Sequence, residues 1–238
     1  MKEELIDFDP SRTDKREFYI KFLSQYQPPA AASRHFASIP WTNKWLTSPA
    51  YNVMPFWSRH AKSSGEDYFF AKTINTAKTI PHMVALGLKD LITPEPSDRA
   101  PEVGSGSPQA IATTGGTAVS GQSPELVCLI QLGERDLDGH PGVIHGGVIC
   151  ALLDDTMSVV LALHLNNVTP RPSGSVFTAN LNTNFRAPVQ TPATVIIKCW
   201  LVRRDTRKWL ITAQIEDQNG RALAEANAIW VVVQRSNL

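Results

Sequence analysis

The sequence lacks several features that would each point to a particular class of protein. Its three cysteines, Cys128, Cys150 and Cys199, lie far apart with no CxxC spacing. Such a sparse, odd set favours buried thiols in a reducing compartment over a disulfide framework or a zinc site. Neither charge is in excess, because the net charge is +1. This balance argues against non-specific nucleic-acid binding, which depends on neutralising phosphates.

Long apolar runs and targeting signals are also missing. No run reaches the roughly 18 to 20 apolar residues of a membrane span, so we expect none. The first 15 residues mix acids and bases without an apolar core, which argues against a secretory signal and a mitochondrial transit peptide. The final Ser-Asn-Leu resembles the peroxisomal Ser-Lys-Leu address but lacks its basic residue. These features predict an intracellular, most simply cytoplasmic, protein, with the mitochondrion and the peroxisome as alternatives.

What is present is the composition of a globular domain with a sizeable core, 238 residues of which 42% are hydrophobic. Residues 1–62 carry short helical patterns, such as Arg16–Tyr26, which Pro28 and Pro29 end. Three tryptophans then lie among prolines between Trp41 and Trp57. We expect this part to be a helical extension that packs on a main domain formed by residues 63–238.

The main domain shows strand patterns on both sides of one helix. Residues 93–124 are rich in Pro, Gly, Ser and Thr, which predicts a mobile insertion loop between two strands. The turn residues of 205–208 and 217–220 predict that the last three strands form an antiparallel meander. The expected strands are Tyr68–Ile74, His82–Leu91, Glu125–Leu132, Val176–Arg186, Ala193–Arg204, Trp209–Asp217 and Ala222–Gln234.

The helix, from about His145 to Asn166, is apolar on all sides, as expected of a buried central helix. The order of elements predicts an α+β fold in which an antiparallel sheet wraps around this helix. Glycines at 142, 146 and 147 open it, and the amides of a helix N-terminus can bind a developing oxyanion. Asp154 and Asp155 are costly to bury there, so at least one should face a polar pocket. From spacing alone, two interpretations stay open: one of these aspartates is functional, or it only forms a structural hydrogen bond to a neighbouring strand.

The segments HPGVIHGGVICALLDDTMS and TANLNTNFRAPV resemble the acyl-CoA thioesterases of the hotdog superfamily, in their phenylacetate-pathway-like branch. That branch has a His-Gly-Gly followed by a helix and an Asp nine residues after the His, here His145 and Asp154. The strand Thr178–Asn182 is similar to that of the mammalian mitochondrial thioesterase superfamily proteins. The resemblance spans about residues 67 to 233 and implies a hotdog fold.

The resemblance also implies roles for individual residues. The Gly146 amide would polarise the thioester carbonyl, Asp154 would act as general base or nucleophile, and Thr178 would hold the water or the carboxylate. Coenzyme A (CoA) would be part of the substrate, with no separate cofactor. In such enzymes the site lies between subunits, so a homodimer or a dimer of dimers would bring Gly146 of one copy to Asp154 of another.

Other positions are less clearly determined. Some members of the family carry Asn or Gln where this chain has Gly139, and His140 is either a polar substitute or a loop residue. His145 either braces the loop or takes part in proton transfer. Asp155 lies about 100° round the helix from Asp154, so we expect it to make a helix-stabilising or interface hydrogen bond.

For the substrate, Arg186 is the predicted contact to a CoA phosphate. The basic turn of Arg203, Arg204, Arg207 and Lys208 is either a second such contact or a solvated surface. The remaining substrate-binding candidates are His140, Gly147 and Asn180. The predicted function is hydrolysis of acyl-CoA. The alternatives are a non-catalytic acyl-CoA binding module and a hotdog hydratase or dehydratase, which needs Asp and His in a different loop-helix pattern.

Overall fold

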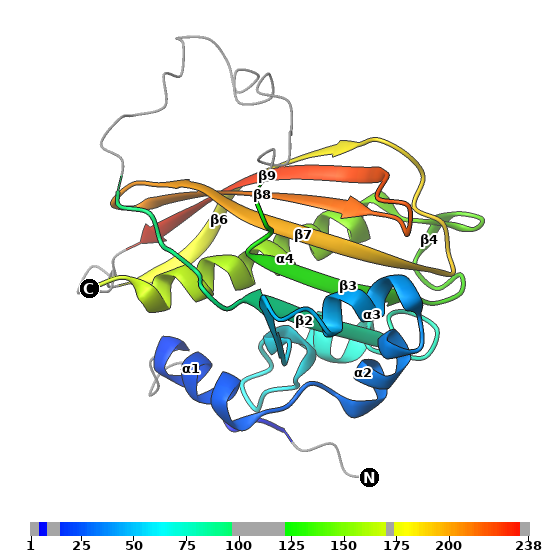
Figure 1. Cartoon of the computed structure of the whole chain (residues 1–238), viewed down its shortest axis with the longest axis horizontal. Coiled ribbons are helices and arrows are strands. Elements are labelled where there is room, and N and C mark those ends of the chain that lie inside the picture. Colours follow the sequence, from blue (N-terminus) through cyan, green and yellow to red (C-terminus); the bar gives the residue numbers. More distant parts are fainter. Residues whose placement is uncertain (1–4, 9–14, 97–121, 170–173, 234–238) are drawn as a thin grey trace.

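The computed structural model describes residues 5–8, 15–96, 122–169 and 174–233 (Figure 1). In this part of the chain, three helices, α1 (Lys15–Gln25), α2 (Ala30–Ala37) and α3 (Pro40–Leu46), precede a seven-stranded antiparallel sheet and its long helix, α4 (Gly146–Asn167). The strands lie in the order β1-β2-β3-β7-β8-β9-β6. Their bounds are β1 Tyr51–Met54, β2 His82–Leu88, β3 Leu126–Leu132, β6 Ser175–Phe185, β7 Ala193–Arg204, β8 Lys208–Glu216 and β9 Ala222–Val233. A separate two-stranded ribbon, β4 (Asp138–His140) and β5 (Val143–Ile144), leads into α4.

The sheet wraps around α4, which is the hotdog arrangement predicted from the sequence (Figure 1). One apolar cluster joins α4 to the inner face of every long strand, with Leu153, Met157 and Val160 fully enclosed. This environment explains why α4 is apolar all round. Its length and mean hydropathy also match those of a membrane span. Here both properties follow from its place in the core.

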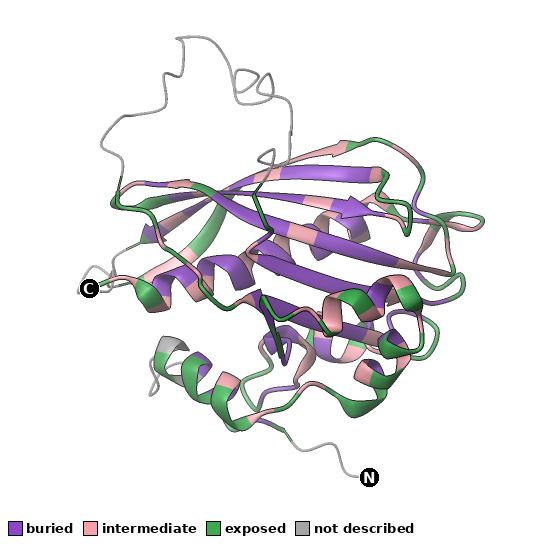
Figure 2. Cartoon of the chain, viewed as in Figure 1, coloured by how far each residue is buried: buried purple, intermediate pink, exposed green. Residues whose placement is uncertain are grey.

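Helices α2 and α3 cover the outer face of one end of the sheet, so β3 is buried on both faces (Figure 2). Because side chains alternate along a strand, Cys128 and Ile130 face α4, whereas Val127 and Leu129 pack with Phe36 of α2. A strand covered on both sides reads as a continuous apolar run, which is the pattern of Leu126–Ile130.

Two local predictions were wrong. Tyr68–Ile74, predicted as a strand, contains a single helical turn, Phe69–Thr73. Its buried residues, Ala71 and Ile74, are three apart, which is a helical spacing that a short apolar run does not reveal. Conversely, Tyr51–Met54 of the expected helical extension forms β1, which pairs with β2. Of the predicted insertion, residues 97–121 lie outside the described part.

Candidate functional site

The N-terminus of α4 is capped by His145. The His145 backbone is extended, and its ring Nδ1 accepts a hydrogen bond of 2.9 Å from the Gly147 amide. The amide of Gly146, which lies between His145 and Gly147, makes no hydrogen bond within the described part of the chain. Cap and helix direction together leave Gly146 as the amide best placed to receive a developing negative charge.

Tight packing explains the glycines around this amide. A Cβ on Gly146 would lie 3.3 Å from Cζ of Phe185, whose ring lies over it from β6. A Cβ on Gly139 would lie 3.0 Å from the His145 Cα. The departure at Gly139 therefore has a physical cause, since the His145 backbone and ring occupy the space that an Asn or Gln side chain needs. Neighbouring His140 is exposed and lines an open depression of about 840 Å³ together with Arg135 and Thr191.

Asp154 and Thr178 are brought together across 24 residues of sequence. The Thr178 hydroxyl donates to Oδ1 of Asp154 at 2.9 Å, from an exposed position on β6. The pairing of β6 with β9 shifts register between Thr178 and Asn180, which is a bulge beside the carboxylate. Bulges of this kind re-aim side chains next to active sites.

The pKa of Asp154 is raised, because partial burial disfavours its charged form, and the hydrogen bond from Thr178 opposes that rise. A carboxylate of raised basicity is a better proton acceptor for water than an ordinary surface carboxylate. The geometry thus provides a half-buried base held by a hydroxyl.

The face of α4 that carries these groups has a regular spacing. Gly146, Cys150 and Asp154 recur every four residues, so they line one side of the helix. The Cys150 thiol lies 3.6 Å from the Thr183 hydroxyl of β6. Sequence reasoning missed Cys150, Thr183 and Phe185 as neighbours of the site, although the i, i+4, i+8 spacing signals Cys150.

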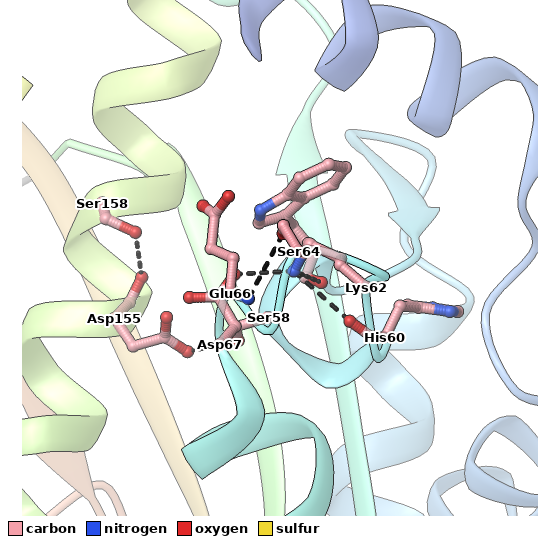
Figure 3. Close-up of polar contacts among 9 residues, drawn as sticks. Ser58, His60, Lys62, Ser64, Glu66, Asp67, Asp155 and Ser158 are labelled. Atoms are coloured by element: carbon pink, nitrogen blue, oxygen red, sulfur yellow. Dashed lines mark hydrogen bonds and ion pairs between the residues drawn. The ribbon is translucent and has the colours of Figure 1, made fainter. Parts of the chain in front are cut away.

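Asp155 points away from this face, toward the N-terminal part of the chain (Figure 3). Its Oδ2 accepts a hydrogen bond of 2.6 Å from the Ser58 hydroxyl. The pKa of Asp155 is raised to about 7, mainly because burial disfavours the charged form. The hydrogen bond from Ser58 lowers this pKa, the nearby charges of Asp67 and Asp154 raise it, and the charge of Lys62 lowers it. The expected helix-stabilising or interface hydrogen bond of Asp155 is here a bond from Ser58 of the N-terminal part of the chain, a partner that sequence reasoning missed.

The predicted substrate-binding residues are not gathered at one place. Arg186 donates through Nε and Nη2 to Oε2 of Glu225, at 2.9 and 2.8 Å, so an internal carboxylate already balances its charge. The backbone amide of Gly147 donates to the His145 ring, so it is not available to a ligand. Asn180 is exposed on β6.

The basic turn divides into different environments. Arg204 is buried, donates to the Pro94 carbonyl and lies over the Trp209 ring. Arg207 and Lys208 are both exposed, and Arg207 donates to the Val232 carbonyl. Among the described residues, no group of three or more His, Cys, Asp and Glu side chains is arranged to hold a metal ion.

Known proteins match the segment of the chain that carries these residues. Residues 141–224, which include Gly146, Asp154 and Thr178, match the model of the thioesterase superfamily. The resemblance to hotdog thioesterases is thereby confirmed.

The individual proteins to which the chain is similar are distant in sequence. The rat acyl-coenzyme A thioesterase THEM4 is 29% identical over 107 residues, covering 44% of this chain and 42% of its own length. This chain therefore matches less than half of that relative. Verlamelin biosynthesis protein B of a Lecanicillium species is 26% identical over 83% of this chain and 87% of its own. Among solved structures, the Escherichia coli PaaI protein of the phenylacetic acid degradation operon has a TM-score of 0.39 at 14% identity, over 45% of this chain and 72% of its own.

Proposed function

We propose that this protein hydrolyses acyl-CoA thioesters to a free acid and CoA. The observation that carries the proposal is the contact of Thr178 with the Asp154 carboxylate, on the helix face that begins at the unbonded Gly146 amide. The match to the thioesterase superfamily and the acyl-coenzyme A thioesterase activity that the rat relative is named for support the substrate class.

The spacing of the two groups calls for a second copy of the chain. Gly146 and Asp154 are eight residues apart on one helix, which separates them by about 12 Å along its axis. One thioester carbonyl needs its oxyanion donor and its attacking water each within about 3 Å. We infer that Gly146 of one copy works with Asp154 and Thr178 of another, in a homodimer or a dimer of dimers.

The edge strand β6 is the surface that favours such a pairing. It lies at the end of the sheet order, and Phe177 and Phe185 on it are 58% and 56% exposed. An eleven-residue edge that carries exposed aromatic side chains is an open template for another chain. Burying this edge against a partner would also remove bulk water from the carboxylate of Asp154.

In the proposed mechanism, Asp154 takes a proton from water as the water oxygen attacks the thioester carbon. The carbonyl oxygen becomes an oxyanion and is stabilised by the Gly146 amide of the partner copy. When the oxyanion collapses and the C=O double bond re-forms, the C–S bond breaks. The CoA thiolate leaves and receives the proton that Asp154 holds, and Thr178 keeps the carboxylate oriented throughout. Contacts of Arg186, His140 and Asn180 with CoA stay predictions, as does an intracellular location.

The direct test is release of free thiol from a panel of acyl-CoA esters. We expect Asp154→Asn to lower kcat by about 100-fold or more, since a general base contributes about 10² to 10⁴. Asp90→Asn, which alters an exposed acid outside the site, is the matched control and should behave like the parent.

The same assay separates the alternative of a non-catalytic acyl-CoA binding module. That alternative is favoured by Gly139, which provides no polar side chain beside His145. Saturable binding of acyl-CoA with no thiol release by the parent would support the module and contradict hydrolysis. Thiol release by Asp154→Asn at the parental rate would remove Asp154 from the mechanism.

A further inference from the structure

Beside the candidate site, about 100° round α4 from Asp154, the N-terminal part of the chain makes a polar contact with the helix. The Ser58 hydroxyl lies 2.6 Å from Oδ2 of Asp155, 97 residues away in sequence. Ser58 is 2% exposed, so water hardly competes for this bond. Figure 3 shows the Asp155 side chain directed from α4 toward the turn that carries Ser58.

Ser58 is itself rigidly placed. Its neighbour Trp57 belongs to an aromatic cluster with Tyr19 and Phe22 of α1, and Ala162 of α4 packs against that cluster. On the other side, Arg59 donates to the carbonyls of Ile74 and Ile80, at the chain segment that enters β2. The short helix Trp57–Arg59 therefore connects α4 to the sheet as a fixed support.

Charged groups also lie near the contact, and Asp67 and Lys62 shift the pKa of Asp155 in opposite directions. Lys62, which is fully buried, forms an ion pair of 2.6 Å with Asp67 (Figure 3). Asp155 keeps the Ser58 hydroxyl as its hydrogen-bond donor, so what it gains from the N-terminal part is a directional bond. A directional bond can set the rotation of a helix, which apolar packing alone specifies less well.

The rotation of α4 matters because Asp154 is the adjacent residue. A turn or slide of the helix that moves Asp155 away from Ser58 also moves Asp154 relative to Thr178, since consecutive residues share one rigid backbone. Given the hydrolysis proposed above, we propose that Ser58 and Asp155 form a positioning pair that sets the orientation of α4 and thereby holds Asp154 against Thr178.

The first test is a double-mutant cycle with thiol release as the measurement. Ser58→Ala and Asp155→Ala should each lower kcat by about 10-fold or more with little change in KM, because a displacement of about 1 Å can cost about 100-fold. The double variant should lose no more than either single variant, because one bond is removed in all three. Asp155→Asn, whose amide oxygen still accepts from Ser58, should retain most of the parental kcat.

The second test needs no catalytic activity. The carboxyl carbon of Asp154 is followed by NMR as a function of pH in the parent and in Ser58→Ala. The Thr178 hydrogen bond lowers the pKa of Asp154, so a helix displaced from Thr178 should show a higher pKa at Asp154. Ser38→Ala removes an exposed hydroxyl that bonds only within its own turn and is the matched control, with parental kcat and titration.

The outcomes are distinct. Additive losses in the cycle would show that Ser58 and Asp155 act independently, and an Asp155→Asn variant as inactive as Asp155→Ala would show that Asp155 acts by its charge. Either result would overturn the positioning pair. Parental kcat and Asp154 titration in Ser58→Ala, accompanied by a lower melting temperature, would make the contact structural only. If the parent releases no thiol from any ester, the proposed hydrolysis fails, and the Asp154 titration alone decides whether the pair positions this residue.

Discussion

Asp154 and Asp155 are adjacent acids of the same type on one apolar helix, and each accepts a hydrogen bond from the hydroxyl of another element. The difference lies in what surrounds them. Thr178 is exposed on the edge strand β6, whereas Ser58 is enclosed between the N-terminal helices and α4. We call the side of α4 that carries Asp154 and faces β6 the open side, and the side that carries Asp155 and faces Ser58 the covered side. The aspartate of the open side can be reached by a substrate, whereas the aspartate of the covered side fastens α4 to the N-terminal part of the chain.

This comparison depends on the open side being completed by a second copy. Phe177→Lys places a charge on the β6 edge, which should disfavour pairing of two edges. We expect a monomer whose kcat falls by about 100-fold or more, since losing an oxyanion donor costs about 10² to 10³. Molar mass by light scattering and thiol release check the two effects.

Val53→Lys places the same charge on β1, the opposite edge of the sheet, and should leave mass and kcat unchanged. A fully active Phe177→Lys monomer would show that one copy holds a complete site, and the proposed pairing of Gly146 with Asp154 between copies would be wrong.

Removing the hydroxyl on the open side should have a smaller effect. Thr178→Ala is expected to lower kcat by about 10-fold, in line with a hydrogen bond to a charged group worth about 1.5 to 3 kcal/mol. The Thr178 bond lowers the pKa of Asp154, so the acid limb of the kcat profile should move to higher pH in the variant. Thr178→Ser keeps the hydroxyl and should keep the profile, whereas an unmoved limb in Thr178→Ala would contradict the assignment.

Asp155→Asn, which keeps the acceptor for Ser58, should show the smallest effect, and that effect is on stability more than on turnover. The pKa of Asp155 is about 7 in the folded protein, compared with an ordinary value of 3.8 in the unfolded chain. The parent should therefore lose stability through this group as pH rises from about 4 to about 7. Asp155→Asn does not titrate, so its melting temperature should gain a few degrees on the parent between pH 5 and pH 8. For the control Asp90→Asn, the difference in melting temperature from the parent should not depend on pH. If the difference for Asp155→Asn were also independent of pH, Asp155 would not be a buried group with a raised pKa.

Much of the fold could be predicted because its patterns are local. The alternating strands after α4 and the all-round apolar helix are properties of short windows, and each was found within a few residues of its bounds. The Tyr51–Met54 strand and the Phe69–Thr73 turn were not found, because a four-residue edge strand and a single turn have too few residues to show a period. Ser58 could not be found either, since no local pattern links it to Asp155.

The sequence by itself determined the positions of Gly146, Asp154 and Asp155 along one helix, because helix geometry converts residue spacing directly into distance and angle. Only the tertiary structure decided which acid faces the open edge and which faces the N-terminal helices. Those contacts span 24 and 97 residues. They depend on how β6 and the short helix Trp57–Arg59 pack around α4, which is a property of the whole core and not of any segment within it.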